Sequence, residues 1–265
     1  MNIQTRASEL ADWIRERVRS SGARGVAVGL SGGVDSALVV RLAQMAVPDQ
    51  VVGVLMPCHS DPRDEADAKL VAEHFNVTVV RVDLAAAYDR LVADLKSAVS
   101  RLPSGQAPVP TADNIDIKSR VPLANIKPRL RMTSLYYIAN SLDYLVAGTG
   151  NRSELTIGYF TKYGDGGVDL LPIGNLLKSE VRAMASVLDV PASIVDKAPS
   201  AGLWLGQTDE AEMGFTYADL ENYLMQGPEA VSPALAMRIE RLVRASDHKR
   251  ALAPVPEEER QVGSG

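Results

Sequence analysis

GLSGGVDS, at residues 29–36, is the stretch that decides the fold of this 265-residue chain. An apolar, strand-like run (Val26 to Leu30) leads into it, and an apolar helical run (Val34 to Ala46) follows. This order of strand, tight turn and helix places several backbone N–H groups at the positive end of a helix dipole. Gly32 and Gly33 can adopt positive φ angles and let phosphate oxygens approach the backbone. The stretch therefore predicts a phosphate-binding turn.

The side chains of this turn agree with a nucleotide ligand. Ser31 and Ser36 supply hydroxyl donors, and Asp35 can hold Mg²⁺. The turn lacks the lysine of a G-x-x-x-x-G-K-[ST] loop, which disfavours a kinase-like or GTPase-like protein. The alternative is an ordinary Gly-rich turn with Ser36 near the helix start. The pattern S-G-G-x-D-S after a strand favours the functional interpretation.

Strands and helices alternate along the first half of the chain. Strands are expected at 51–56, 77–82 and 144–147, and helices at 7–18, 65–74 (with Ala66 and Leu70 facing inward) and 84–99. This alternation predicts an α/β fold, a doubly wound parallel sheet with helices on both faces. Ligands of such sheets lie beyond the carboxyl ends of the strands, where residues 31–36, 57–60 and 149–154 would meet.

The second half of the chain is predicted to be mainly helical. A loop is expected from Leu102 to Val121, and then a helix to Ser141 that is interrupted, or begins afresh, at Pro128. Residues 161–167 form a Gly-rich loop, and helices return at 179–188, 216–224 and 233–245. We expect one domain over residues 1–253 and a polar, disordered tail over 254–265.

The composition describes a soluble globular protein with 46% hydrophobic and 23% charged residues. The net charge of −5 argues against a general affinity for nucleic acid or acidic membranes. The single cysteine, Cys58, excludes an internal disulfide and suits a reducing compartment, where it is expected to be a packing residue. No apolar run reaches the roughly twenty residues of a membrane span, and no signal peptide precedes the first helix. We expect a cytoplasmic protein.

Several blocks together resemble the ammonia-dependent NAD⁺ synthetases, members of the N-type ATP pyrophosphatase group with the adenine nucleotide α-hydrolase-like fold. After GLSGGVDS, the blocks that carry the resemblance are NIKPRLRM (125–132), GTGNRSEL (148–155), GYFTKYGDGGVDLLP (158–172), APSAGLW (198–204), GQTDE (206–210) and DHKR (247–250). The resemblance extends from about Gly25 to Ala253. The first motif occurs in several enzyme families, whereas residues 160–167 together with 198–210 are much more specific.

The resemblance implies a reaction in two steps at one site. The nicotinate carboxylate of deamido-NAD⁺ attacks the α-phosphate of ATP, which gives an NAD-adenylate and pyrophosphate. Free ammonia then attacks the activated carbon, and AMP leaves. Neither step needs a protein nucleophile, so the protein positions the reactants, neutralises charge and excludes water. The resemblance also implies a homodimer that shares part of the dinucleotide site, and residues 121–141 are a candidate interface.

The resemblance assigns roles to individual residues, each weighed against a structural alternative. Asp35 could simply favour the helix dipole, Glu154 could complete a capping box with Asn151, and Arg129 and Arg131 could belong to a solvated helical face. Asp35 and Lys178 are expected to neutralise charge and position ATP, with no catalytic nucleophile. The implied ATP-binding residues are Gly29, Leu30, Ser31, Gly32, Gly33, Val34, Asp35, Ser36, Thr149, Lys178 and Ser200; Arg129, Lys162, Asp169, His248 and Lys249 would contact deamido-NAD⁺, and Asp35 and Glu154 would bind Mg²⁺.

Two other functions remain open at this point. One is a related amide ligase of the GMP synthetase type. The presence of Lys162, Asp169 and residues 198–210 argues against this alternative. The other is a catalytically silent nucleotide-binding module, which the presence of Asp35 and Glu154 opposes. Pro128 departs from the family pattern, and the direction of Arg129 depends on the backbone at this proline. Residues 102–120 and 202–214 are candidates for loops that become ordered on binding.

Overall fold

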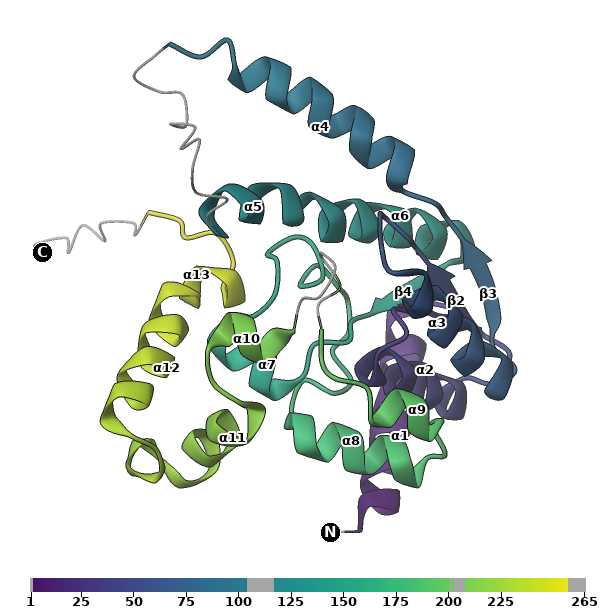
Figure 1. Cartoon of the computed structure of the whole chain (residues 1–265). Coiled ribbons are helices and arrows are strands. Elements are labelled where there is room, and N and C mark those ends of the chain that lie inside the picture. The colour runs from purple at the N-terminus through teal and green to yellow at the C-terminus, as the bar shows by residue number, and fades with distance from the viewer. Residues whose placement is uncertain (1, 104–116, 201, 203–207, 257–265) are drawn as a thin grey trace, which may run out of the picture.

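A four-stranded parallel sheet lies between α6 (Ile126–Leu142) on one side and α1 (Ile3–Ser21) and α2 (Val34–Ala46) on the other (Figure 1). The computed structural model describes residues 2–103, 117–200, 202 and 208–256. The strands lie in the order β3-β2-β1-β4. Their bounds are β1 Gly25–Gly29, β2 Val51–Leu55, β3 Thr78–Arg81 and β4 Tyr144–Ala147. The predicted α/β fold, with a parallel sheet between helical layers, is confirmed.

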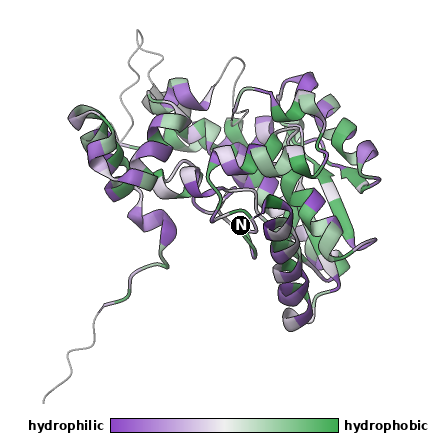
Figure 2. Cartoon of the chain, turned by 90° about the horizontal axis from the view of Figure 1, so that it is seen from below, coloured by the Kyte–Doolittle hydropathy of each residue, from purple (hydrophilic) through white to green (hydrophobic). Residues whose placement is uncertain are grey.

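Alternating side chains of the strands build two cores, one on each face of the sheet. In β1, Val26 and Val28 belong to one buried cluster, whereas Ala27 belongs to the other. The first face is covered by α1 (Ile3–Ser21), α2 (Val34–Ala46), α3 (Pro62–His74), α8 (Lys178–Val187) and α9 (Ala192–Val195). The second face is covered by α6 (Ile126–Leu142), with α4 (Ala85–Val99) beside it. The hydrophobic residues accordingly follow the strands and the adjacent helix faces (Figure 2).

A third cluster lies beside the sheet, built by the helices of the C-terminal part (Figure 1). Its buried members include Met213, Phe215, Leu220 and Ile239. The elements are α7 (Arg152–Ile157), α10 (Asp209–Met213), α11 (Tyr217–Gln226), a 3₁₀ turn at Pro228–Ala230, α12 (Pro233–Ala245) and α13 (Asp247–Arg250). The division into one domain over residues 1–253 stays a prediction, and most of the predicted tail, residues 257–265, lies outside the described residues.

Helix α3 differs from its prediction at its start and in its buried face. It begins at Pro62 because the Asp61 side chain accepts a hydrogen bond from Arg63 N (2.9 Å) and proline suits the first helical position. The inward-facing positions predicted in this helix were wrong, since Ala66 is exposed and Leu70 is 41% exposed. The helix instead packs on the sheet through Ala68, Val71 and Ala72.

The predicted break near Pro128 is present, but the preceding loop ends earlier than expected. Helix α5 (Ile117–Ala124) already begins within the segment predicted as loop. A new helix, α6, follows at Ile126, so Pro128 lies in its first turn, where backbone N–H groups have no partner within the helix. The proline therefore costs α6 no internal hydrogen bond. The rest of the predicted loop, residues 104–116, lies outside the described residues.

Candidate active site

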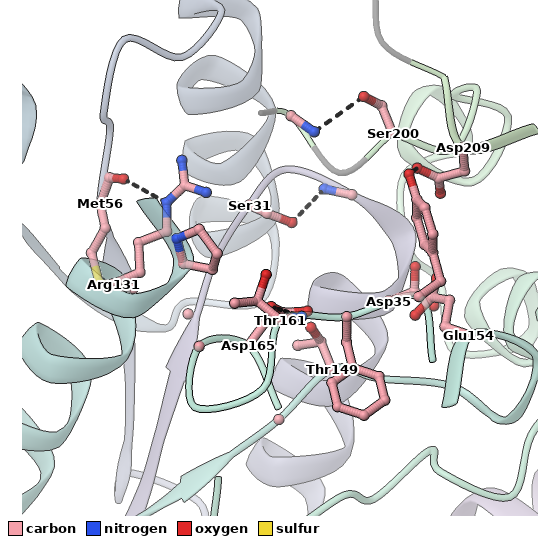
Figure 3. A pocket seen from close by; sticks show the side chains of 18 of the residues that line it. Ser31, Asp35, Met56, Arg131, Thr149, Glu154, Thr161, Asp165, Ser200 and Asp209 are labelled. Carbon is pink, nitrogen blue, oxygen red and sulfur yellow. Dashed lines mark hydrogen bonds between the residues drawn. The ribbon is translucent and has the colours of Figure 1, made fainter. Parts of the chain in front are cut away.

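A cavity of about 470 Å³ lies at the carboxyl ends of β1, β2 and β4 (Figure 3). Its walls come from the turn after β1, from Met56 and Ser60 after β2, and from Gly148 and Thr149 after β4. The cavity is located where the parallel sheet predicted it. The chain runs outward from β1 to β2 and β3 and then returns to place β4 on the other side of β1, which makes β1 and β4 the switch point of the sheet.

Backbone conformation and close packing both require glycine at position 32. Gly32 has a φ of 79°, which side-chain-bearing residues rarely adopt. A Cβ atom there would overlap the carbonyl oxygen of Asp64 and lie 2.9 Å from the Cβ of Asp67. The turn therefore rests directly on the beginning of α3.

The two serines of the turn brace it internally. Ser36 Oγ donates to Gly33 O (2.9 Å) and accepts from Ser31 N (3.2 Å), while Ser31 Oγ accepts from Gly33 N (3.3 Å; Figure 3). Gly33 is the N-cap of α2 and offers no side-chain hydrogen bond to the first turn. The amino end of α2 therefore remains available to an anionic ligand.

Three charged side chains from three different elements meet at one side of the cavity. Lys178 Nζ, on α8, lies 2.5 Å from Asp35 Oδ2 and 3.2 Å from Glu154 Oε1. Only 5% of the Lys178 side chain is exposed. Burial alone would lower the pKa of Lys178, but the charges of Asp35 and Glu154 outweigh it and raise the pKa above its ordinary value. Lys178 is therefore a permanent cation between two carboxylates.

Glu154 performs the predicted capping role and also faces the charged cluster. The Asn151 side chain accepts from Glu154 N (3.1 Å), and Glu154 Oε2 accepts from Asn151 N (3.4 Å), which completes a capping box on α7. The other oxygen, Oε1, faces Lys178. Asn151 also donates to Asp35 Oδ1 (2.9 Å) and so connects the two carboxylates. The capping and ligand interpretations of Glu154 are thus compatible.

The arrangement of Asp35 and Glu154 fits Mg²⁺. Both carboxylates converge on one position that already holds a cation, the Lys178 ammonium group. Within the described part of the chain, no group of three or more His, Cys, Asp or Glu residues could hold a metal ion. Mg²⁺ typically binds one or two protein carboxylates and takes its other ligands from substrate phosphates and water.

Asp209, Tyr159 and Tyr217 extend this cluster, although none of the three was predicted from the sequence. The Tyr217 hydroxyl lies 2.9 Å from Asp209 Oδ2 and 3.2 Å from Glu154 Oε1. The Tyr159 hydroxyl lies 3.2 Å from Asp209 Oδ1 and 2.7 Å from Glu212 Oε2. Only the position of Asp209 in the GQTDE block could have drawn attention to it.

Arg131 lies in the cavity wall opposite this cluster (Figure 3). Its guanidinium group donates to Met56 O (3.2 Å) and Ser60 Oγ (3.1 Å), and burial lowers its pKa. The interpretation of Arg131 as part of a solvated helical face was therefore wrong. Cys58 is buried in the cluster beneath the second face of the sheet, as expected of a packing residue.

The remaining ATP-site candidates divide between the cavity wall and its surroundings. Thr149 and Ser200 line the cavity, although Ser200 is exposed and its hydroxyl accepts from Gly202 N (3.1 Å). Gly32 and Ser36 lie behind the lining and support the turn.

Only Lys249 among the five dinucleotide candidates lines the cavity. Its ammonium group donates to Gly158 O and Phe160 O, each at 2.7 Å. Beyond the cavity, Lys162 donates to His248 O, and Arg129 donates to Lys162 O (3.4 Å).

Asp169 lies apart from these four candidates. It accepts from Val146 N (2.8 Å) and from the Tyr136 hydroxyl (2.9 Å). Both of its carboxylate oxygens are therefore held by the sheet and by α6.

The chain matches the family model described as NAD synthase over residues 6–253. A protein of Carboxydothermus hydrogenoformans named NH(3)-dependent NAD(+) synthetase is 50% identical over 97% of this chain and 98% of its own. The solved NMN synthetase of Francisella tularensis has a TM-score of 0.84 at 35% identity and covers 97% of this chain and 99% of its own. The NH3-dependent NAD synthetase of Campylobacter jejuni has a TM-score of 0.75 at 28% identity, and the match covers 97% of this chain and 100% of its own.

Proposed function

The chain belongs to the NAD synthase family, and on this premise we infer that it is a ligase that amidates deamido-NAD⁺ to NAD⁺ with ammonia and ATP. The observation that carries this function is the cavity that joins the phosphate-binding turn to the cluster of Asp35, Glu154 and Lys178, in a chain 50% identical to a named ammonia-dependent NAD⁺ synthetase. Neither the GMP synthetase type of ligase nor a silent nucleotide-binding module is favoured by these matches.

The proposed reaction proceeds through an acyl-adenylate. A carboxylate oxygen of the nicotinate ring bonds to the α-phosphorus of ATP, and the bond from that phosphorus to the bridging oxygen breaks, which releases pyrophosphate. The nitrogen of ammonia then bonds to the acyl carbon, a proton leaves the nitrogen, and the carbon–oxygen bond to AMP breaks. The cavity would supply orientation and shelter the adenylate from water.

The residues around the turn would bind ATP. Backbone N–H groups at the amino end of α2 would hold phosphate oxygens, with Gly32 allowing their close approach. Lys178 would compensate negative charge that develops on the phosphates. Asp35 and Glu154 would hold Mg²⁺, which when bound would neutralise charge on the leaving pyrophosphate. Thr149 and Ser200, at the cavity wall, would complete the ATP site.

The second substrate would occupy the region around α13. We propose that Lys249 marks the boundary between the cavity and the dinucleotide site, because it lines the cavity and belongs to the same short helix as His248. Arg129, Lys162 and His248 adjoin this boundary through their hydrogen bonds. Asp169 would support the site from the end of β4, since it accepts from Val146 N.

We propose that the protein acts as a homodimer and that α4 takes part in the interface. Helix α4 has no buried residue, and Leu91, Leu95 and Val99 form an exposed apolar stripe along it. Tyr137, on the neighbouring α6, is 76% exposed. This surface adjoins the interface predicted at 121–141, so the interface would include both helices.

A second substrate remains a candidate because a solved structure with a TM-score of 0.84 is named NMN synthetase. Nicotinate mononucleotide carries the same nicotinate carboxylate as deamido-NAD⁺ but lacks the AMP half. The same adenylation and amidation would convert it to NMN. The residues outside the cavity would contact the AMP half of deamido-NAD⁺. Their affinity for this half would determine which of the two substrates the protein prefers.

A direct assay tests the proposed function. The purified protein is incubated with ATP, Mg²⁺ and either deamido-NAD⁺ or nicotinate mononucleotide, with ammonium or glutamine, and the nucleotides are separated by chromatography. NAD⁺ and AMP forming together with ammonium, and little NAD⁺ with glutamine, is the expected result. NMN forming faster than NAD⁺ would favour the second candidate. Absence of AMP under every condition would reject both.

We further propose that the protein acts in the cytoplasm on small molecules, without a nucleic-acid partner. The net charge of −5 and the single cysteine support this proposal. Among the residues that the structure describes, no helix is long and apolar enough to cross a membrane.

A further inference from the structure

Tyr217 contacts three charged groups of the cluster at once, although nothing in its sequence pattern indicates a functional role. Its hydroxyl lies between Glu154 Oε1 (3.2 Å) and Asp209 Oδ2 (2.9 Å). Its ring centre lies 5.2 Å from the ammonium nitrogen of Lys178, within cation–π distance. We propose that Tyr217 is a positioning residue that orients Glu154 and Lys178 and thereby sets the affinity of the site for a divalent cation.

The two oxygens of Glu154 have different partners, and Tyr217 acts on the one that faces the cluster. Oε2 accepts from Asn151 N in the capping box, which fixes the carboxylate plane from one side. Oε1 lies within hydrogen-bond distance of both Lys178 Nζ and the Tyr217 hydroxyl. A cation that replaces the ammonium group at Oε1 would therefore bind an oxygen whose direction the tyrosine already fixes.

Asp209 makes this arrangement adaptable. The Tyr217 hydroxyl has one proton and two carboxylate acceptors, and the contact to Asp209 is the shorter one. When one lone pair of Oε1 binds a metal ion, the hydroxyl can still donate a hydrogen bond to the other. Asp209 Oδ2 holds the hydroxyl group in this position. Asp209 Oδ1 is in turn held near the Tyr159 hydroxyl.

The backbone around Tyr217 holds the side chain in position. Tyr217 is the first residue of α11, only 6% exposed, and its N–H donates to Glu210 Oε1 (2.9 Å). The N-cap Thr216 and Asp219 form a capping box that fixes the start of the same helix. Helix α11 thus presents the Tyr217 hydroxyl group to a cluster whose charged members come from α2, α7, α8 and α10.

Phenylalanine at position 217 separates positioning from packing. Tyr217→Phe keeps the ring and its packing in the C-terminal cluster but removes the hydroxyl between Glu154 and Asp209. Loss of a residue that orients a metal ligand typically weakens metal binding by about 10- to 100-fold. Tyr223→Phe is the matched control, because Tyr223 lies on the same helix and packs against the same hydrophobic cluster.

The inference rests on the proposed assignment of Asp35 and Glu154 as metal ligands, and its test does not require turnover. Mn²⁺ is titrated into the full-length, substrate-free protein, and the free ion is followed by electron paramagnetic resonance. The dissociation constant should rise about tenfold or more in Tyr217→Phe and remain unchanged in Tyr223→Phe. In the assay of NAD⁺ formation, the Mg²⁺ concentration for half-maximal rate should rise by the same factor.

Two results would overturn the inference. The first is an unchanged Mn²⁺ dissociation constant in Tyr217→Phe, even with a lowered melting temperature, because the tyrosine would then only pack. The second is wild-type protein that binds no Mn²⁺ at millimolar concentration. Failure of the proposed function would be distinguishable, because wild-type protein would then form no NAD⁺ whatever its affinity for Mn²⁺.

Discussion

The backbones of Gly32 and Asp64 meet at the edge of the cavity, where Asp64 belongs to the lining and Gly32 lies behind it. A Cβ atom on Gly32 would overlap the carbonyl oxygen of Asp64. Lys197 holds the same part of α3, since its ammonium group lies 2.8 Å from Asp64 Oδ1 and 2.6 Å from Asp67 Oδ2. The turn after β1 is therefore packed directly against the start of α3.

Gly32→Ala should destabilise the protein and weaken ATP binding. A positive φ costs a side-chain-bearing residue about 1–2 kcal/mol, and the clash with Asp64 adds to this. Gly22→Ala is the matched control, because Gly22 has a φ of 74° but nothing within 4 Å of the added Cβ. Urea unfolding should show a larger loss for Gly32→Ala, and calorimetric titration should show weaker ATP binding only there. Equal losses for both variants would contradict the backbone contact.

Asp35→Asn should abolish adenylation while the fold remains intact. The substitution removes one of the two charges that pair with Lys178, but keeps the size of the side chain. We expect pyrophosphate exchange into ATP, dependent on deamido-NAD⁺, to fall by on the order of 100-fold or more. Circular dichroism should show an unchanged spectrum, and Asp12→Asn, an exposed position on α1, serves as the control. Normal turnover by well-folded Asp35→Asn protein would reject the proposed metal ligand.

Glu154→Gln and Glu154→Ala should separate the capping role from the metal role. Glutamine can still accept from Asn151 N, so the helix cap survives while the charge facing Lys178 is lost. The Gln variant should therefore lose activity and Mg²⁺ response at nearly wild-type melting temperature. The Ala variant should lose in addition about 1 kcal/mol of unfolding free energy. If Glu154→Gln only lowers the melting temperature, Glu154 is a cap and nothing more.

The buried thiol of Cys58 should make stability depend on alkaline pH. Burial raises the pKa of Cys58, against the opposing charges of Arg131 and Lys127. The folded pKa therefore exceeds the unfolded value, so the contribution of the protonated thiol is present below about pH 8.5 and is lost as the pH rises through the folded pKa. Between pH 8 and 10, unfolding free energy should fall more steeply for wild type than for Cys58→Ala.

The thiol itself gives a second readout of the same property. The native protein should react with a disulfide reagent only as fast as it opens, whereas the unfolded protein should react at once. Rapid reaction of the native thiol at pH 8 would show that Cys58 is accessible and would contradict the buried position.

Leu95→Glu should shift the protein from dimer to monomer. The charge would fall in the middle of the apolar stripe of α4, and burying it unpaired in an interface costs several kcal/mol. Ser97→Glu is the control, because residue 97 lies on the opposite side of the same helix. Sedimentation velocity should show a smaller species for Leu95→Glu alone. A monomeric wild type would reject the proposed interface at the outset.

Local patterns were sufficient to predict the sheet and the turn that begins the site. Strand β4 and helices α2 and α12 have the predicted bounds, because each combines a clear apolar period with a strong start or stop signal. The capping box of Asn151 and Glu154 was the only signal for α7. The short helices α9, α10 and α13 were missed, since four or five residues are too few to show a helical period.

Long-range contacts explain what the sequence could not reveal about the site. Tyr217 reaches Glu154 from 63 positions away, and Arg131 reaches Met56 from 75 positions away. Neither contact can be predicted from the local sequence pattern, because each depends on how whole helices and strands pack against one another. The resemblance to a family identified Lys178 and Glu154 as site residues. Their opposite charges alone could not have shown that the two side chains form an ion pair.

The pairing of β1 with β4 has a consequence for the newly made chain. Residues 26 and 145 are partners in the sheet, so β1 presents an open parallel edge until β4 has left the ribosome. The segments β1, β2 and β3 can pair before then, but Glu154, Lys178 and Tyr217 follow still later. Synthesis must therefore continue beyond Tyr217 before the charged cluster can close. Translational pausing or truncation before β4 would leave an exposed strand that other nascent chains can join.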